Sequence, residues 1–146
     1  MLLPEYVTKQ EVQRVCSELG IRDWTDLPEA NILPSEAEII MNDVIAGSMD
    51  IPVEDFLQGL EVELEHGLRF MDANVTNNHP ILTGRIVLAH LKETVDYYKR
   101  LEVAELEGDL LKAIKAKDSI KIQGKYTKLV AAMSVLNQSV LDELLQ

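Results

Sequence analysis

Apolar residues recur at spacings of three and four along most of this chain, and this periodicity is the strongest constraint on its fold. Such spacings put side chains on one face of an α-helix, whereas a half-buried strand would need strict alternation. One run consists of Val53, Leu57, Leu60, Leu64, Leu68 and Met71. A second consists of Tyr126, Leu129, Met133, Leu136, Val140 and Leu144. The pattern therefore predicts a protein built of helices.

Capping residues, prolines and one polar loop divide the chain into about five helices. The expected helices are one that opens with the capping box Thr8–Glu11, one from Ser35, one from Pro52 to Met71, one from Pro80 to at least Leu101 and one from Ser119 to Leu144. Trp24, in the first connector, is expected to fill the core, and His79 to cap the helix after it. We therefore expect an all-α, single-domain bundle over residues 1–146.

Composition restricts the partners. The chain has 146 residues, 47% of them apolar, which is enough for one domain with an ordinary core. Its formal net charge of −11 repels phosphate backbones, so no nucleic-acid partner is expected. No apolar run approaches the roughly 20 residues that cross a bilayer, so no membrane partner is expected either. Cys16 is the single cysteine and is predicted to be a buried, inert thiol in a cytoplasmic protein.

Residues 109–146 form a C-terminal helical segment with two notable features. Its apolar stripe is close to a heptad seam, which either closes the core or pairs with a second subunit. Beside it lies a cluster of lysines, namely Lys112, Lys115, Lys117, Lys121, Lys125 and Lys128. A solvated helix surface explains these lysines, and so does an acidic partner such as the acidic half of a second copy. The partner interaction that the sequence indicates is a homodimer through this segment.

Two short strings carry the chemistry that the sequence offers. Glu63 and His66 are three residues apart on one expected helix, and His90 and Glu93 are three apart, in reversed order, on the next. Side chains three apart on a helix are neighbours. If the two helices pack together, two imidazoles and two carboxylates meet, and such ligands suit zinc, iron or manganese.

Three interpretations of these residues stay open. In the first, they form a metal-free hydrogen-bond network in a structural or assembly module. In the second, Glu63, His66, His90 and Glu93 bind a divalent metal, with Tyr97 behind them; di-metal bundles repeat the Glu-x-x-His order on two helices, whereas here one helix reverses it. In the third, His90 is the centre of an acid–base pocket, oriented by Glu93 and Tyr97. The residues do not decide whether the chain is an enzyme.

Two glycines share the helix flank that carries Glu63 and His66. Gly59 and Gly67 lie there, between two phenylalanines. A glycine inside a helix costs about 1 kcal/mol relative to alanine. Their presence predicts that another backbone or a ligand approaches this flank closely.

The chain resembles an uncharacterised domain family of bacteria and their phages over residues 16–101. The similarity is carried by Leu19-Gly20-Ile21, Trp24, Phe56, Gly59-Leu60, Val62-Glu63-Leu64-Glu65-His66-Gly67, Asn74-Val75-Thr76, Leu82-Thr83-Gly84, Ile86, Ala89-His90-Leu91, Glu93 and Asp96-Tyr97-Tyr98. The resemblance implies no activity, although its pattern centres on the same histidines and glutamates. We therefore expect a small helical protein of unknown role with a candidate His/Glu site.

Overall fold

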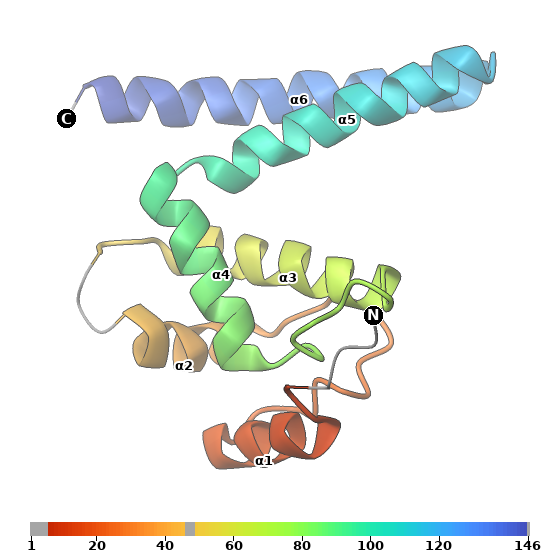
Figure 1. The fold of residues 1–146 in the computed structure, drawn as a ribbon. Helices are drawn as coiled ribbons and strands as arrows, with labels where there is room; N and C mark the ends of the chain where they lie inside the picture. Colours follow the sequence, from red (N-terminus) through yellow and green to blue (C-terminus); the bar gives the residue numbers. More distant parts are fainter. Residues whose placement is uncertain (1–5, 46–48, 146) are drawn as a thin grey trace. The chain divides into compact units, whose positions relative to one another are not determined.

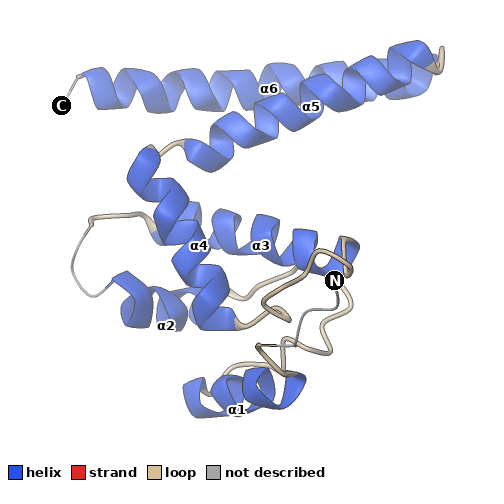
Figure 2. Ribbon diagram, viewed as in Figure 1, coloured by secondary structure: helices blue, strands red, loops and turns tan. Residues whose placement is uncertain are grey.

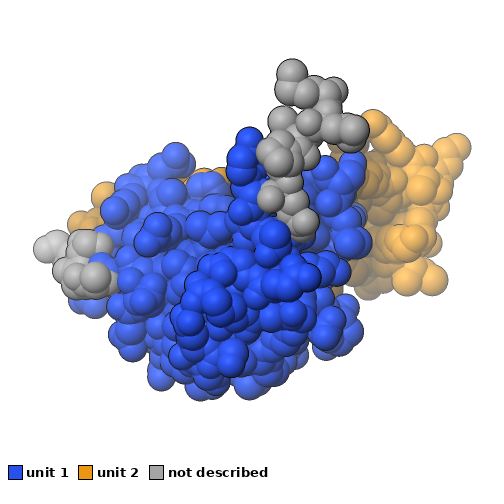
Figure 3. All heavy atoms as spheres, turned by 60° about the horizontal axis from the view of Figure 1, so that its bottom comes forward, with its two compact units in different colours: residues 1–93 blue, residues 94–146 orange. Residues whose placement is uncertain are grey.

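The computed structural model describes residues 6–45 and 49–145, and within them every regular element is a helix (Figure 1 and Figure 2). The helices are α1 Lys9–Leu19, α2 Pro34–Ile45, α3 Val53–Arg69, α4 Pro80–Glu93, α5 Tyr97–Lys115 and α6 Ser119–Leu144. They fall into two compact units, Met1–Glu93 and Thr94–Gln146, which Figure 3 colours separately. The all-α prediction is confirmed, but the described residues form six helices rather than about five.

The additional helix arises because the long helix predicted after Pro80 is in fact two helices, α4 and α5. In the connection before α5, the Asp96 carboxylate is almost fully buried. It accepts hydrogen bonds from Thr94 Oγ1 at 2.5 Å and from Arg100 Nε and Nη2 at 2.8 and 2.7 Å. Aspartate and threonine side chains that bond locally compete with helix continuation. Apolar periodicity persists across such a break, so the pattern alone did not reveal it.

The core of residues 1–93 forms where α2, α3 and α4 pack against one another, and α1 packs against α4. Figure 1 shows α4 crossing α3. The largest fully buried side chains of this unit are Trp24, Phe56, Ile40, Leu60, Leu64 and Leu91. Trp24 therefore fills the core from a connector, as predicted. Helices α2 and α4 approach closely at Gly84, where an added Cβ would lie 2.8 Å from Ile40 Cγ2.

An ion pair between exposed Arg22 and buried Glu36 fixes the start of α2. Glu36 is 3% exposed and accepts hydrogen bonds from the backbone N–H, Nε and Nη2 of Arg22 and from the backbone N–H of Leu33. Burial raises the pKa of Glu36, but the hydrogen bonds from Arg22 and Leu33 lower it by more, so the net pKa is below the usual value. The connector 22–33 is thereby tied to the first turn of α2.

Two further predictions from composition can be compared with the fold. Cys16 is buried on α1, and burial raises the pKa of its thiol, as expected for an unreactive cysteine. In the described part of the chain, no helix combines the length and the apolar character that crossing a bilayer requires.

The second unit is a helical hairpin in which α5 and α6 pack along each other (Figure 1). At the turn, Lys117 has a left-handed φ of 54°, and the Asp118 side chain accepts a hydrogen bond from the backbone N–H of Lys121 to cap α6. Asp109 on α5 pairs with Lys125 of α6 at 2.6 Å and with Lys112 at 3.0 Å, which lowers its pKa to about 2. Part of the lysine cluster therefore holds the two helices of the hairpin together.

Candidate functional site

The packing of α3 against α4 brings three of the four predicted site residues together. Glu63 Oε1 lies 3.2 Å from His90 Nδ1, and Glu63 Oε2 lies 3.7 Å from His66 Nδ1. The Glu63 side chain is 14% exposed, compared with 29% for His90 and 45% for His66. A largely buried carboxylate thus stands between two imidazoles from two helices. Helical spacing predicted the Glu63–His66 pair, and the α3–α4 packing added His90.

The other two predicted residues are placed differently. Glu93 is exposed at the last position of α4 and forms no ion pair with the imidazoles among the described residues. Tyr97 begins α5 and belongs to the second unit. Among residues 6–45 and 49–145, no three His, Cys, Asp or Glu side chains are arranged so that they could hold a metal ion. The metal role of Glu63, His66, His90 and Glu93 therefore stays a prediction.

A cavity of about 210 Å³ adjoins this group. It lies between the C-terminal half of α3, the loop that follows and the middle of α4. The residues that line it are Glu63, His66, Gly67, Phe70, Ala73, Asn74, Val75, Thr76 and Ile86. Its walls are thus largely apolar or uncharged, with the Glu63 carboxylate at one side.

The loop at this cavity packs so closely on α3 that position 67 has no room for a side chain. An added Cβ would lie 2.1 Å from Asn78 Oδ1 and 3.1 Å from Asn74 Nδ2. The Asn74 amide donates to the Gly67 carbonyl oxygen at 3.1 Å and to Asn78 Oδ1 at 2.8 Å. Close approach at Gly67 is therefore explained by two asparagine side chains. The asparagine-rich segment 74–78 was the available sequence signal, but its contact with α3 depends on the tertiary fold.

Asn77 and Asn78 give this loop its shape. Their φ angles are 48° and 62°, in the left-handed region that asparagine tolerates better than most residues. The Asn77 side-chain amide also donates to the carbonyl oxygen of Val7 at 2.5 Å. The loop is thus tied both to α3 and to the segment that precedes α1.

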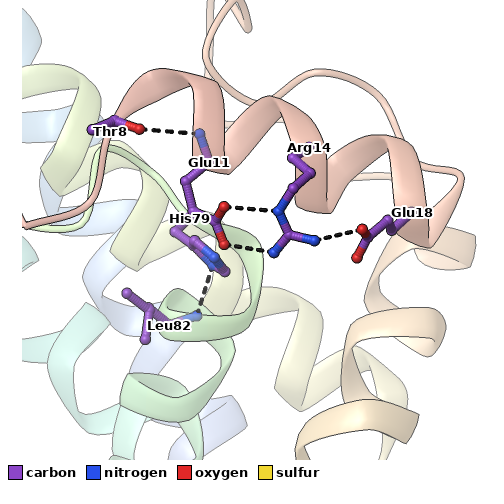
Figure 4. Close-up of polar contacts among 6 residues, drawn as sticks. All are labelled: Thr8, Glu11, Arg14, Glu18, His79 and Leu82. Carbon is purple, nitrogen blue, oxygen red and sulfur yellow. Dashed lines mark hydrogen bonds and ion pairs between the residues drawn. The ribbon is translucent and has the colours of Figure 1, made fainter.

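His79 caps α4, as predicted. Its Nδ1 accepts a hydrogen bond from the backbone N–H of Leu82 at 3.4 Å, and its side chain lies beside Glu11 of α1 (Figure 4). Glu11 in turn accepts from Arg14 at 2.6 and 2.8 Å, and Arg14 also pairs with Glu18. Burial lowers the pKa of His79, although the nearby Glu11 charge acts in the opposite direction. The neutral imidazole is therefore the form that this cap stabilises.

A second candidate surface lies on α6. Its exposed apolar side chains include Tyr126, Val130, Met133, Leu141 and Leu144. At 100° per residue these five positions fall within an arc of about 80° around the helix. The apolar stripe that the sequence predicts for this helix is therefore only partly buried. Its member Leu129 is buried, whereas Tyr126, Met133 and Leu144 are exposed.

These features define an all-helical protein with a carboxylate between two imidazoles in one unit and a partly exposed apolar hairpin in the other. The chain belongs to the family described as "Protein of unknown function (DUF5661)", whose model matches residues 12–107. The match confirms the resemblance to an uncharacterised family and ends within α5, so α6 lies outside it. Neither the curated proteins nor the solved structures gave a match.

Proposed function

We propose that the protein is an assembly module that pairs with a second copy of itself through α6. The observation that carries this proposal is the exposed apolar arc formed by Tyr126, Val130, Met133, Leu141 and Leu144. The exposed Asn137 interrupts this arc at its centre, but large exposed apolar side chains gathered on one helix face are a feature of protein interfaces. Burial of such side chains is favourable by about 25 cal/mol per Å² of apolar surface.

Two properties of α6 favour a second copy as the partner. Residues 129–141 contain no charged side chain, so two such segments can meet without burying charge. Within the exposed arc, Tyr126, Val130 and Met133 are spaced by four and three residues, and Leu141 and Leu144 by three, as on helices that pair with each other. The hairpin also has little interior of its own, since its buried apolar residues among those described are Tyr98, Ala113, Leu129 and Ala132.

Sedimentation equilibrium of the full chain over a wide concentration range tests the proposal. The expected mass is about twice the 16.4 kDa of one chain, and the Met133→Glu variant should return to the monomer. Ala131→Glu is the matched control, because Ala131 is exposed on α6 but lies about 120° from the centre of the arc. A wild-type monomer at every concentration, or equal masses for both variants, would contradict the proposal.

The composition also bears on the compartment and the partners of this proposed assembly. A single buried cysteine suits a reducing compartment, so we place the protein in the cytoplasm. With a net charge of −11, nucleic acid is not among its proposed partners. In this proposal Glu63, His66 and His90 are a structural network that joins α3 to α4.

A second candidate function is metal binding by Glu63, His66, His90 and Glu93. The distances of 3.2 and 3.7 Å from the Glu63 carboxylate to two imidazoles favour it, whereas the exposed position of Glu93 does not. Inductively coupled plasma mass spectrometry on untagged protein tests it. About one equivalent of zinc, iron or manganese, lost in the His66→Ala/His90→Ala variant, would support it. Metal-free protein after reconstitution would refute it.

A further inference from the structure

The exposed arc on α6 is symmetric along the helix about Asn137, which is exposed at its centre. Met133 and Leu141 lie four residues before and after Asn137. Val130 and Leu144 lie seven residues before and after it, and all four apolar side chains are exposed. A two-fold axis at Asn137, perpendicular to the helix, therefore places each of these apolar side chains opposite another apolar side chain of an antiparallel second copy.

Asn137 suits a position on such an axis. Its amide carries both donors and an acceptor, so two copies of this side chain can hydrogen-bond to each other. A polar residue of this kind within an apolar helix pair lowers stability but fixes the register of the two helices. The arc also fits a parallel pair, in which each residue meets its own copy. The direction of pairing therefore depends on the charges outside the arc.

Charge is distributed unevenly along the hairpin. Residues 109–128, which surround the turn between α5 and α6, contain six lysines and two aspartates, a net charge of +4. The rest of the second unit contains two basic and six acidic side chains, a net charge of −4. Three exposed lysines near the turn, Lys115, Lys117 and Lys128, form no ion pair within the part of the chain that the structure describes. The closed end of the hairpin is therefore basic, whereas the open end, where α5 begins and α6 ends, is acidic.

The first unit adds negative charge at the open end. Residues 1–93 contain six basic and 17 acidic side chains, so this unit has a net charge of −11. The chain passes from it into the hairpin at the open end, because Thr94 follows directly and α5 begins at Tyr97. A parallel pair would gather both basic turns at one end and join both acidic units at the other, so like charges would repel at each end. In an antiparallel pair, each basic turn points toward the end at which the acidic unit of the partner is joined.

We propose that two copies pair antiparallel through α6, with the two-fold axis at Asn137. The direction presupposes the self-association proposed above, and it gives the lysine cluster a role in that assembly. Exposed charge pairs contribute little to stability individually. The apolar arc therefore supplies the affinity, and the charges select the direction.

Pulsed electron paramagnetic resonance on the nitroxide-labelled full chain tests the direction. Ile120→Cys puts a label on a residue that is 83% exposed, 17 positions before Asn137 and about 100° from the centre of the arc. At a rise of about 1.5 Å per residue, an antiparallel pair separates the two labels by about 50 Å. Gln138→Cys is the matched control, because it is exposed and lies five full turns from Ile120 on the same side of α6. Its two labels should lie within about 25 Å of each other, since paired helix axes are about 10 Å apart. Cys16 is buried, so the wild type checks that it stays unlabelled.

Each outcome separates the direction from the self-association. A long distance at Ile120 with a short one at Gln138 supports the antiparallel pair. Equal distances at the two positions mean a parallel pair, which overturns the direction but leaves the self-association intact. No coupling at either position, together with a wild type that sediments as a monomer, overturns both. Labelled chains that are monomeric while the wild type is a dimer would place the interface away from the arc and would also overturn the proposal.

Discussion

At the scale of single residues, His79 is the group whose role depends most directly on protonation. It accepts the N–H of Leu82 through Nδ1, and a protonated ring nitrogen cannot accept a hydrogen bond. The charged groups that act on it are Glu11 and Arg14 from α1 and Arg85 from α4. Glu11 favours the protonated form, whereas burial and the two arginines favour the neutral form, and the neutral form prevails.

We therefore expect His79 to make the stability of the fold depend on pH. Its pKa is lowered in the folded state, so the unfolded chain takes up the proton first as pH falls. The stability that neutral His79 contributes is complete above its unfolded pKa of about 6.5 and is lost as pH falls from there toward the folded pKa. Urea unfolding at pH 7, 6 and 5 measures this loss.

The matched variant for this prediction is His79→Asn. Asparagine is a good helix N-cap and does not titrate in this range. His66 and His90 remain in both proteins, so their contribution cancels in the comparison. The variant should lose less stability between pH 7 and pH 5 than the wild type. Equal losses would show that His79 does not carry the effect.

At the scale of elements, two helical glycines differ in what surrounds them: one is covered by other side chains and the other faces open space. Gly67 on α3 lies under Asn74 and Asn78, whereas Gly124 on α6 has nothing within 4 Å of an added Cβ. The same substitution should therefore have opposite effects at these two positions.

Gly67→Ala should destabilise the fold by about 1–3 kcal/mol, because the asparagine loop must move away from α3. Gly124→Ala should stabilise it by about 0.5–1 kcal/mol through helix propensity alone. Chemical denaturation of both variants measures the two free energies of unfolding. A stabilising Gly67→Ala would mean that the loop does not press on α3 as described.

At the scale of the whole molecule, the distribution of buried apolar residues differs between the two units. Trp24, Phe56, Leu60 and Leu64 are fully buried in the first, whereas the hairpin leaves several large apolar side chains exposed. A hairpin of two helices has little interior, so pairing with another hairpin contributes stability that depends on concentration.

If α6 pairs with a second copy, the thermal midpoint must rise with protein concentration. For a chain of this size we expect an increase of about 2 °C for each tenfold increase in concentration. Differential scanning calorimetry over a hundredfold range measures it, with Met133→Glu as the variant whose midpoint should not move. A constant wild-type midpoint would argue against the dimer.

The same calorimetric traces test the prediction that residues 1–146 form a single domain. A single domain should unfold in one transition, whereas two independent units should unfold in two.

Local properties of the sequence were sufficient to predict the helices and several of their ends. Apolar spacing identified the stripes of α3 and α6, and the capping groups of Thr8 and His79 act within three residues of themselves. Burial of Trp24 and Cys16 also followed from composition and position, because there are few ways to shield such side chains in a small helical protein.

Only the tertiary structure decided which distant groups meet. Three contacts each join residues 7 to 27 positions apart, and no local signal encodes them: His90 beside Glu63, the asparagine loop against Gly67 and the Arg22–Glu36 pair. The division of the helix after Pro80 also escaped the pattern, because apolar periodicity is unaffected by a short break stabilised by Thr94, Asp96 and Arg100. Spacing along a helix determines which side chains are neighbours, whereas packing between helices determines what those neighbours face.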